Sequence, residues 1–167
     1  MLRRVSLAAV AAASVLLLLP ALPGEGNAHA QMTMNLASAR RGPGVNTIID
    51  GYAHAVSVPQ GTTGRTRGQR THEPFTIRKR VDASTPLLYQ ALARSETIPA
   101  VTLRIPTSRA AGGPTMTITL TSARIIAIES SAGEELPTEE VSFNYERIKW
   151  TSSEGGTEFE DNWRENN

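Results

Sequence analysis

The chain has 167 residues and a formal net charge of +1, so its length suits one domain and its charge does not favour nucleic acid or a membrane surface. It contains no cysteine, which excludes a disulfide framework, a thiolate zinc site and a cysteine nucleophile. Hydrophobic residues make up 40% of the chain, enough for a packed core and too many for a disordered protein.

The first thirty residues have the layout of a secretory signal peptide. Two arginines precede an almost wholly apolar run at residues 5–19, which Pro20 ends. Residues 28–30 have the sequence Ala-His-Ala, a small-residue cleavage pattern, so we expect cleavage between Ala30 and Gln31. An uncleaved membrane anchor is the alternative, although the apolar run is short for a span of about 20 residues.

Cleavage would leave a mature domain of residues 31–167. Removing 30 of the 167 residues leaves 137, and the removed segment carries two arginines and one glutamate, so the formal charge falls from +1 to zero. We expect this mature protein to be secreted or periplasmic, without a membrane anchor.

The period-2 alternation of apolar residues predicts β-strands in the first half of the mature chain. Met32, Met34 and Leu36 indicate a first strand, which ends before the Gly-Pro-Gly of residues 42–44. A second strand is expected over residues 48–58, with one face formed by Tyr52, His54, Val56 and Val58. A third begins at residues 75–77 and continues into the charged residues 78–80.

A basic loop is predicted between the second and third strands. Residues 59–71 lack apolar side chains and are interrupted by three glycines. The loop carries Arg65, Arg67 and Arg70 with no acidic residue among them.

The period then changes to that of a helix at residues 85–94. Ser84 or Thr85 is the expected N-cap, and Pro86 falls in the first turn, where its missing N–H costs nothing. The predicted apolar stripe consists of Leu87, Leu88, Ala91 and Leu92. Because the helix is short, packing against a sheet must hold it.

The rest of the chain is predicted to be β. Strands are expected over residues 101–105, 115–126, 141–145 and 159–163, with an acidic loop at 130–138 and a Gly-Gly turn at 155–156. After Arg147 the apolar positions shift to Ile148 and Trp150, which predicts a bulge or a change of packing face. The elements together favour a compact antiparallel barrel or sandwich with one short helix.

No catalytic or metal-binding pattern is found, and no cofactor is expected. His54 and His72 lack further ligands at zinc spacing, and the acidic residues 139–140 and 158–161 lack the spacing of a calcium loop. No G-x-S-x-G elbow or phosphate-binding glycine loop is present. Trp150 and Trp163 could stack on sugars, but such residues are more often core or interface anchors. The sequence therefore favours a protein that is not an enzyme.

Three separated stretches, residues 72–92, 117–125 and 139–163, resemble signature stretches of the haemolysin-coregulated protein (Hcp) family, in the family's order. The first contains His-Glu-Pro-Phe-Thr-Ile and Ser-Thr-Pro-Leu-Leu-Tyr; the last contains Val-Ser-Phe-Asn-Tyr-Glu and ends with Glu-Asp-Asn-Trp. The similarity spans roughly residues 48–163.

This resemblance implies a β-barrel of two sheets with one flanking helix, and a structural subunit of type VI secretion. It further implies a homohexameric ring that stacks into a tube, inside a contractile sheath and below a spike protein, and that can carry small effectors. The basic loop lies where the family has an extended loop that contacts the next ring, so Arg65, Arg67 and Arg70 are candidate stacking residues. The alternative is a secreted β-sandwich binding module, ring-forming or monomeric.

Overall fold

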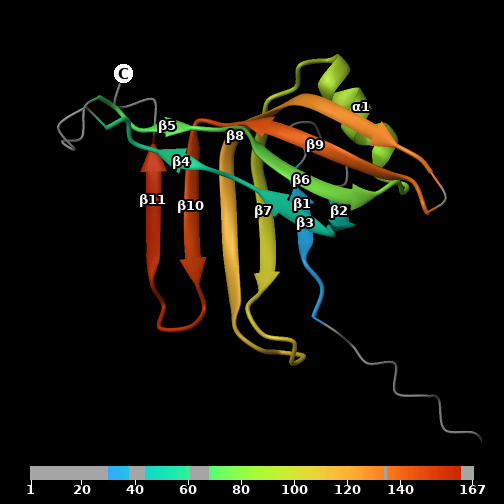
Figure 1. The fold of residues 1–167 in the computed structure, drawn as a ribbon. Coiled ribbons are helices and arrows are strands. Elements are labelled where there is room, and N and C mark those ends of the chain that lie inside the picture. Colours follow the sequence, from blue (N-terminus) through green and yellow to red (C-terminus); the bar gives the residue numbers. More distant parts are fainter. Residues whose placement is uncertain (1–29, 38–43, 61–67, 134, 163–167) are drawn as a thin grey trace, which may run out of the picture.

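The computed structural model describes residues 30–37, 44–60, 68–133 and 135–162. The strands and the helix follow one another along the chain as shown in Figure 1. They are β1 Thr33–Leu36, β2 Val45–Ile48, β3 Gly51–Ala53, β4 Val56–Ser57, β5 Thr71–His72, β6 Phe75–Arg80, α1 Thr85–Ala93, β7 Ile98–Pro106, β8 Thr115–Ser131, β9 Thr138–Asn144, β10 Arg147–Ser152 and β11 Glu158–Asn162.

Two antiparallel sheets share the long strand β8. The first sheet, called sheet A, has the order β2-β1-β7-β8-β10-β11, and the second, called sheet B, has the order β8-β9-β6-β3. In Figure 1 the long strands of sheet A run side by side, and β9, β6 and β3 cross over their upper ends. A separate pair, β4 with β5, lies over the upper ends of β10 and β11.

Strand β8 passes from one sheet to the other at its middle. Up to Ala123 it pairs with β7, and from Arg124 onward it pairs with β9. Just before this change of partner, Ser122 has φ +53°, a left-handed conformation that costs a side-chain-bearing residue about 1–2 kcal/mol. The register with β9 also shifts between Ile125 and Ala127, so the strand bends there as at a β-bulge.

The core lies between the two sheets. Its buried side chains alternate along β7, β8, β9 and β6 with exposed or half-buried polar ones, as expected for strands with one face inward. Fully buried members are Met34, Phe75, Ile77, Leu88, Val101, Leu103, Leu120, Ala123, Val141, Phe143 and Ile148.

The predicted β class with one short helix is confirmed, but the backbone ladder does not close into a barrel. Among the described residues, the edge strands β2 of sheet A and β3 of sheet B do not pair with each other; the chain passes directly from one to the other, and there the Asp50 N–H donates to the Arg78 carbonyl. The edges of sheet A at β2 and β11 pair with no other strand in the part of the chain described.

The prediction of one continuous second strand over residues 48–58 is wrong. The structure divides this stretch among β2, β3 and β4, which belong to three different sheets. Alternation could not reveal the breaks, because the larger side chains stay at even-numbered positions from Tyr52 to Val58 in the sequence, although the chain leaves sheet A at residues 49–50.

Helix α1 packs against β8 at one end of the sandwich. Ser84 occupies its N-cap position and Pro86 its first turn, as predicted, but Ser84 makes no side-chain capping bond. Leu88 is fully buried, and Ala91 and Leu92 are partly buried against the core. The prediction that Leu87 shares this buried stripe is wrong: its side chain is 47% exposed, because it lies on a side of the helix that neither sheet covers.

Within the described ranges, no helix has the length and apolar character needed to cross a membrane.

A buried ionic cluster fixes the start of the helix. The Lys79 ammonium, fully buried on β6, donates to Glu139 Oε1 on β9 and to Asp82 Oδ1 before α1, both at 2.9 Å. Thr85 Oγ1 donates to the same Glu139 oxygen at 2.8 Å, and Thr47 on β2 donates to Asp82 Oδ2 at 2.6 Å. Burial favours the neutral acid, but the bonds from Ser84, Thr47 and Lys79 outweigh it and hold the pKa of Asp82 well below its ordinary value.

The predicted change of packing face near Ile148 is confirmed. At Tyr145 and Glu146 the chain leaves β9 in sheet B and enters β10 in sheet A, and the Glu146 N–H donates to the Thr121 carbonyl. The Gly155-Gly156 turn is also confirmed, with φ values of +75° and +64° that suit glycine.

We predict that Leu88→Ala destabilises the protein by about 2–5 kcal/mol, because it leaves a cavity between α1 and β8. Leu87→Ala, one residue earlier and largely exposed, should cost less than about 0.5 kcal/mol. Urea unfolding of both variants measures the difference, and equal losses would show that α1 is packed on a different face.

Candidate functional site

Two histidines that the sequence left unconnected meet at one tyrosine. His54 follows β3 and His72 lies on β5, and each places a ring nitrogen against the hydroxyl of Tyr145, at 2.6 Å from Nε2 of His54 and 2.9 Å from Nδ1 of His72. Their ring centroids are 6.0 Å apart. Tyr145 is buried, and it lies at the turn where the chain passes between sheets.

Asp161 on β11 completes this group. Its Oδ2 lies 3.0 Å from Nε2 of His72, and Arg70 pairs with both of its carboxylate oxygens. We call Arg70, His72, Asp161, Tyr145 and His54 the histidine cluster. Asp161 and the His72 side chain are almost fully buried, whereas the Arg70 side chain is 31% exposed.

The electrostatics of the cluster keep its groups in defined states. Burial and then the negative charge of Asp161 raise the pKa of Tyr145, so the phenol stays protonated and is not an activated nucleophile. Burial and then the charge of His72 lower the pKa of His54. Burial alone would raise the pKa of Asp161, but the bonds and charges of Arg70 and His72 bring it below its ordinary value.

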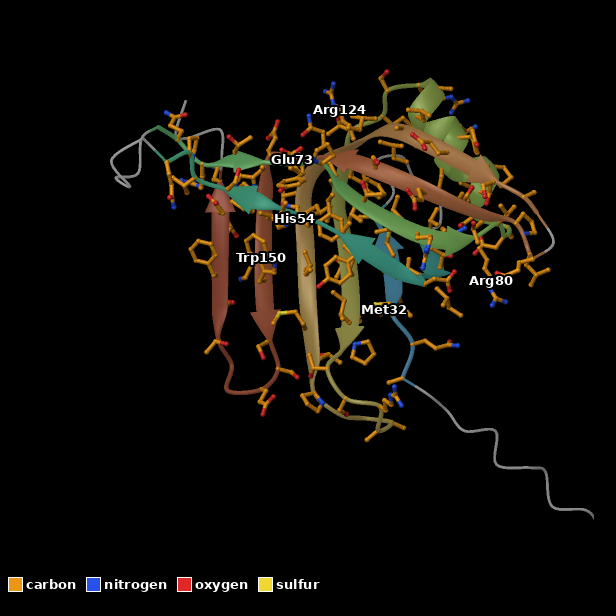
Figure 2. All side chains as sticks on the ribbon, viewed as in Figure 1. Met32, His54, Glu73, Arg80, Arg124 and Trp150 are labelled. Atoms are coloured by element: carbon orange, nitrogen blue, oxygen red, sulfur yellow. The ribbon has the colours of Figure 1, made fainter. Side chains whose placement is uncertain are left out.

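The cluster attaches the β4–β5 hairpin to sheet A. Arg70 and His72 belong to the hairpin side, whereas Asp161 belongs to the edge strand β11. An aromatic row continues the contact: the His54 ring stacks on Phe75 at 5.3 Å and lies 6.0 Å from Trp150, and Figure 2 shows His54 and Trp150 together beneath β4. The arrangement positions a loop; among the described residues no three His, Asp or Glu side chains are grouped to hold a metal ion.

Both open edges of sheet A carry exposed apolar side chains. Phe159 on β11 is 63% exposed and stacks on Trp150 with ring centroids 5.9 Å apart. At the opposite edge, Ile48 on β2 is 52% exposed. An unpaired strand edge with exposed apolar residues is suited to pairing with another chain.

A groove of about 800 Å³ lies between β6 and the loop that connects β8 to β9. Its charged lining mixes both signs, with Arg78 and Arg80 on β6 facing Asp50 and Glu135. A groove of balanced charge gives no preference for an anion or a cation, so it does not define a ligand class.

The residues of the two predicted charged loops, basic and acidic, differ in where the structure places them. Of the predicted stacking arginines, Arg70 is held inside its own chain by Asp161, whereas Arg65 and Arg67 lie outside the described residues. The acidic loop is shorter than expected, because β8 extends to Ser131 and β9 begins at Thr138. Glu135 is exposed, whereas Glu139 on β9, just after the loop, is buried against Lys79.

The predicted signal peptide also lies almost wholly outside the described residues, which begin at Ala30. Gln31 is exposed and lies two positions before the first residue of β1. The predicted cleavage point is therefore next to the first strand of the domain.

Sequence reasoning missed the histidine cluster. Residues 54, 72, 145 and 161 have no common spacing, and the pairs that meet are separated by 73 to 91 positions. The sequence held only part of the information needed to find the cluster. His72 begins the first Hcp-like stretch, residues 72–92, but which residues it contacts depends on how the two sheets are joined.

The fold and the open edges define a class of protein, a two-sheet antiparallel β domain suited to association through its strand edges. The family described as "Type VI secretion system effector, Hcp" matches residues 45–151. The "Major exported protein" of Pseudomonas aeruginosa PAO1 is 33% identical over 128 residues, which cover 70% of this chain and 74% of that protein. The chain belongs to the Hcp family of type VI secretion, and it is an Hcp-like structural subunit.

Solved structures have the same fold. A crystal structure of an Hcp protein has a TM-score of 0.71 at 24% identity, over 80% of this chain and 99% of that one. The secreted protein Hcp3 of Pseudomonas aeruginosa has a TM-score of 0.66 at 25% identity, over 80% and 98%. Hcp1 of Escherichia coli, solved as a double tryptophan variant, has a TM-score of 0.70 at 22% identity, over 80% and 98%.

Proposed function

We propose that copies of this chain form a homohexameric ring in which β11 of one copy lies beside β2 of the next. The observation that carries the proposal is that one sheet has two open edges, each with an exposed apolar side chain. Two different edges of the same sheet make a heterologous contact, and such contacts generate a ring when the rotation closes. Pairing would also remove both edges from solvent, where they invite aggregation.

We propose in addition that the ring is non-catalytic and serves as a tube unit, with a spike protein, a contractile sheath and small effectors as partners. Family membership supports these partners. The cluster that keeps Tyr145 protonated and ties Arg70 to Asp161 supports a positioning role for the polar residues. The protein would reach its site of action by secretion.

A secreted binding module remains the second candidate, because one observation favours it. Phe159 is exposed and stacks on the partly buried Trp150, and an exposed aromatic ring of this kind can hold a sugar ring. The two functions differ in the mass of the purified protein: a ring gives a hexamer, and a free binding module gives a monomer.

We predict that Phe159→Ser weakens the contact between copies at least tenfold, because a central aromatic anchor contributes about 2 kcal/mol or more. Sedimentation velocity should show the hexamer dissociating on dilution. Leu136→Ser is the matched control, since Leu136 is 66% exposed but lies in the β8–β9 loop away from both edges. A Phe159→Ser hexamer as stable as the wild type would refute the edge contact.

For stacking, we propose that the basic loop of one ring meets the acidic loop of the next through Arg65 and Arg67, with Glu134 and Glu135 opposite. Arg70 is left out, because reversing its charge would place two carboxylates together at Asp161. Exposed ion pairs contribute only about 0–1 kcal/mol each, but a ring repeats every pair around its face.

We predict that rings form short stacks at low salt and separate at about 1 M salt, where screening shortens to about 3 Å. In negative-stain microscopy, R65E/R67E should give single rings at low salt. R104E/R124E makes the same charge change at two exposed arginines on β7 and β8 and should keep the stacks. Loss of stacking in both variants would assign the effect to net charge and not to the loop.

We also propose export through a signal peptide that is cleaved after Ala30. Mass spectrometry of protein recovered outside the cytoplasm should find an N-terminus at Gln31, as the cleavage pattern predicts. An intact Met1 on exported protein would contradict cleavage and leave the ring proposal untouched.

A further inference from the structure

The ammonium of Lys79 contacts two carboxylates in the interior of the protein. Lys79 on β6 and Glu139 on β9 are direct partners in the antiparallel pair, and neither side chain has any exposed surface. The Nζ atom donates to Glu139 Oε1 and Asp82 Oδ1, both at 2.9 Å, and to the Arg80 carbonyl at 2.7 Å. Removing two charges from water is costly, and a buried ion pair is often no more stable than apolar side chains of similar volume.

The two oxygens of the Glu139 carboxyl have unequal surroundings. Oε1 accepts from Lys79 and from Thr85 Oγ1, which lies 2.8 Å away, whereas Oε2 is buried without a hydrogen-bond partner among the described residues. A buried charged oxygen that lacks a donor is unfavourable, and a neutral carbonyl oxygen in its place costs less. The pair would therefore be more stable if its two charges were removed without moving the side chains.

We propose that Lys79 and Glu139 condense to an isopeptide bond, an amide that links Nζ to Cδ and joins β6 to β9 covalently. The Nζ–Cδ bond forms, the Cδ–Oε1 bond breaks and one water molecule leaves. No atom is oxidised or reduced, so the reaction needs no cofactor and no second reactant. Contact between the two groups replaces a bimolecular encounter, and the neutral product removes both buried charges.

The hydrogen bonds of the cluster provide a path for each proton of the ammonium. One proton crosses to Glu139 Oε1, which leaves a neutral amine that attacks Cδ. A second passes from Nζ to Asp82 Oδ1 and on to Oε1, which departs as water while Asp82 returns to its carboxylate form. The third stays on the amide nitrogen and donates to the Arg80 carbonyl. Thr85 already donates to the departing oxygen, and Oε2 becomes the amide oxygen.

Glu139, and not Asp82, is the carboxyl that reacts. Asp82 lies three positions after Lys79 and its side chain is 42% exposed, so water competes with the amine there. Burial opposes its charge, but the bonds from Ser84, Thr47 and Lys79 hold the pKa of Asp82 below its ordinary value. Asp82 therefore stays in the carboxylate form, which is a poor electrophile but can accept a proton from Nζ.

The bond would give this chain the kind of cross-link that a disulfide gives others. The chain contains no cysteine. Lys79 and Glu139 are 60 positions apart, and a covalent link between them restricts the unfolded chain as a disulfide does. It would also fix the register of β6 against β9, on which sheet B and the start of α1 depend.

Mass spectrometry of the purified, folded chain tests the proposal, once the protein has been incubated until its mass is constant. Under denaturing conditions the intact protein should be lighter than its sequence requires by the mass of one water. Trypsin should fail to cleave after Lys79, so the digest should contain the dipeptide of residues 79–80 attached to Glu139 within residues 125–147. A folded protein of full mass, whose digest gives the two peptides separately, would overturn the proposal.

Variants separate this cross-link from other losses of water. Lys79→Arg keeps the positive charge but has no amine, so the protein should retain its full mass. Asp82→Asn should slow the loss of water by about a hundredfold or more, because it removes the group that relays the second proton. A loss of water that persists in Lys79→Arg would place the dehydration elsewhere, as in a succinimide at Asp50-Gly51, and would overturn the proposal.

The chain contains a matched control for burial. Lys149 contacts Glu158 at 2.8 Å in a pair of the same chemistry, but these side chains are 37% and 60% exposed. This pair should stay unlinked in the wild-type digest, and Lys149→Arg should lose one water as the wild type does. Links at both pairs would show that contact alone, and not burial, causes the reaction, and would contradict the mechanism. None of these outcomes depends on whether the protein forms rings.

Discussion

Both sheets depend on strand β8, because one continuous strand has to pair with β7 and β10 in its first half and with β9 in its second. The strand satisfies this constraint by bending at Ser122, whose φ of +53° costs about 1–2 kcal/mol. The bend is offset by the core, since it allows buried residues of sheet B, such as Val141 and Phe143, to share one cluster with Leu103 and Leu120 of sheet A. Helix α1 also packs on β8, so any loss of the bend would separate the helix, the core and both sheets.

Two buried polar clusters connect segments that the sheets leave apart. At the helix end, Lys79 joins β6, β9 and the start of α1, and a buried charge of this kind is tolerated only with several partners. At the other end, Tyr145 joins the β4–β5 hairpin to the turn between the sheets, and Asp161 extends the contact to β11. The first cluster is built around a fully buried lysine, whereas the second is built around a buried tyrosine hydroxyl. Each cluster therefore fastens an element that lies outside the two sheets, the helix at one end and the hairpin at the other.

Strand β11 takes part both in the proposed contact between copies of the chain and in the attachment of the β4–β5 hairpin. Asp161 on this strand faces inward and binds the hairpin, while Phe159 two residues earlier lies exposed beside the open edge. In the proposed ring, a neighbour that covers Phe159 would therefore lie next to the strand that holds the hairpin. The opposite edge, β2, is tied to the helix end through Thr47 and Asp82. Each edge of sheet A is thus stiffened by a different cluster, which favours a contact of defined geometry over non-specific strand pairing.

The sequence by itself determined the class of fold, most strands and the family, because alternation, the Ser-Thr-Pro helix start and the signature stretches are local patterns. It could predict the change of packing face near Ile148 from apolar parity, but not the division of residues 48–58 among three sheets, since parity does not change there. It placed Leu87 in the helix stripe, and this error arose because burial depends on what covers a side chain and not on spacing. The histidine cluster and the open edges were decided by tertiary structure alone. Residues 73 to 91 positions apart meet only because β8 bends between two sheets and carries β9, β10 and β11 back past the hairpin.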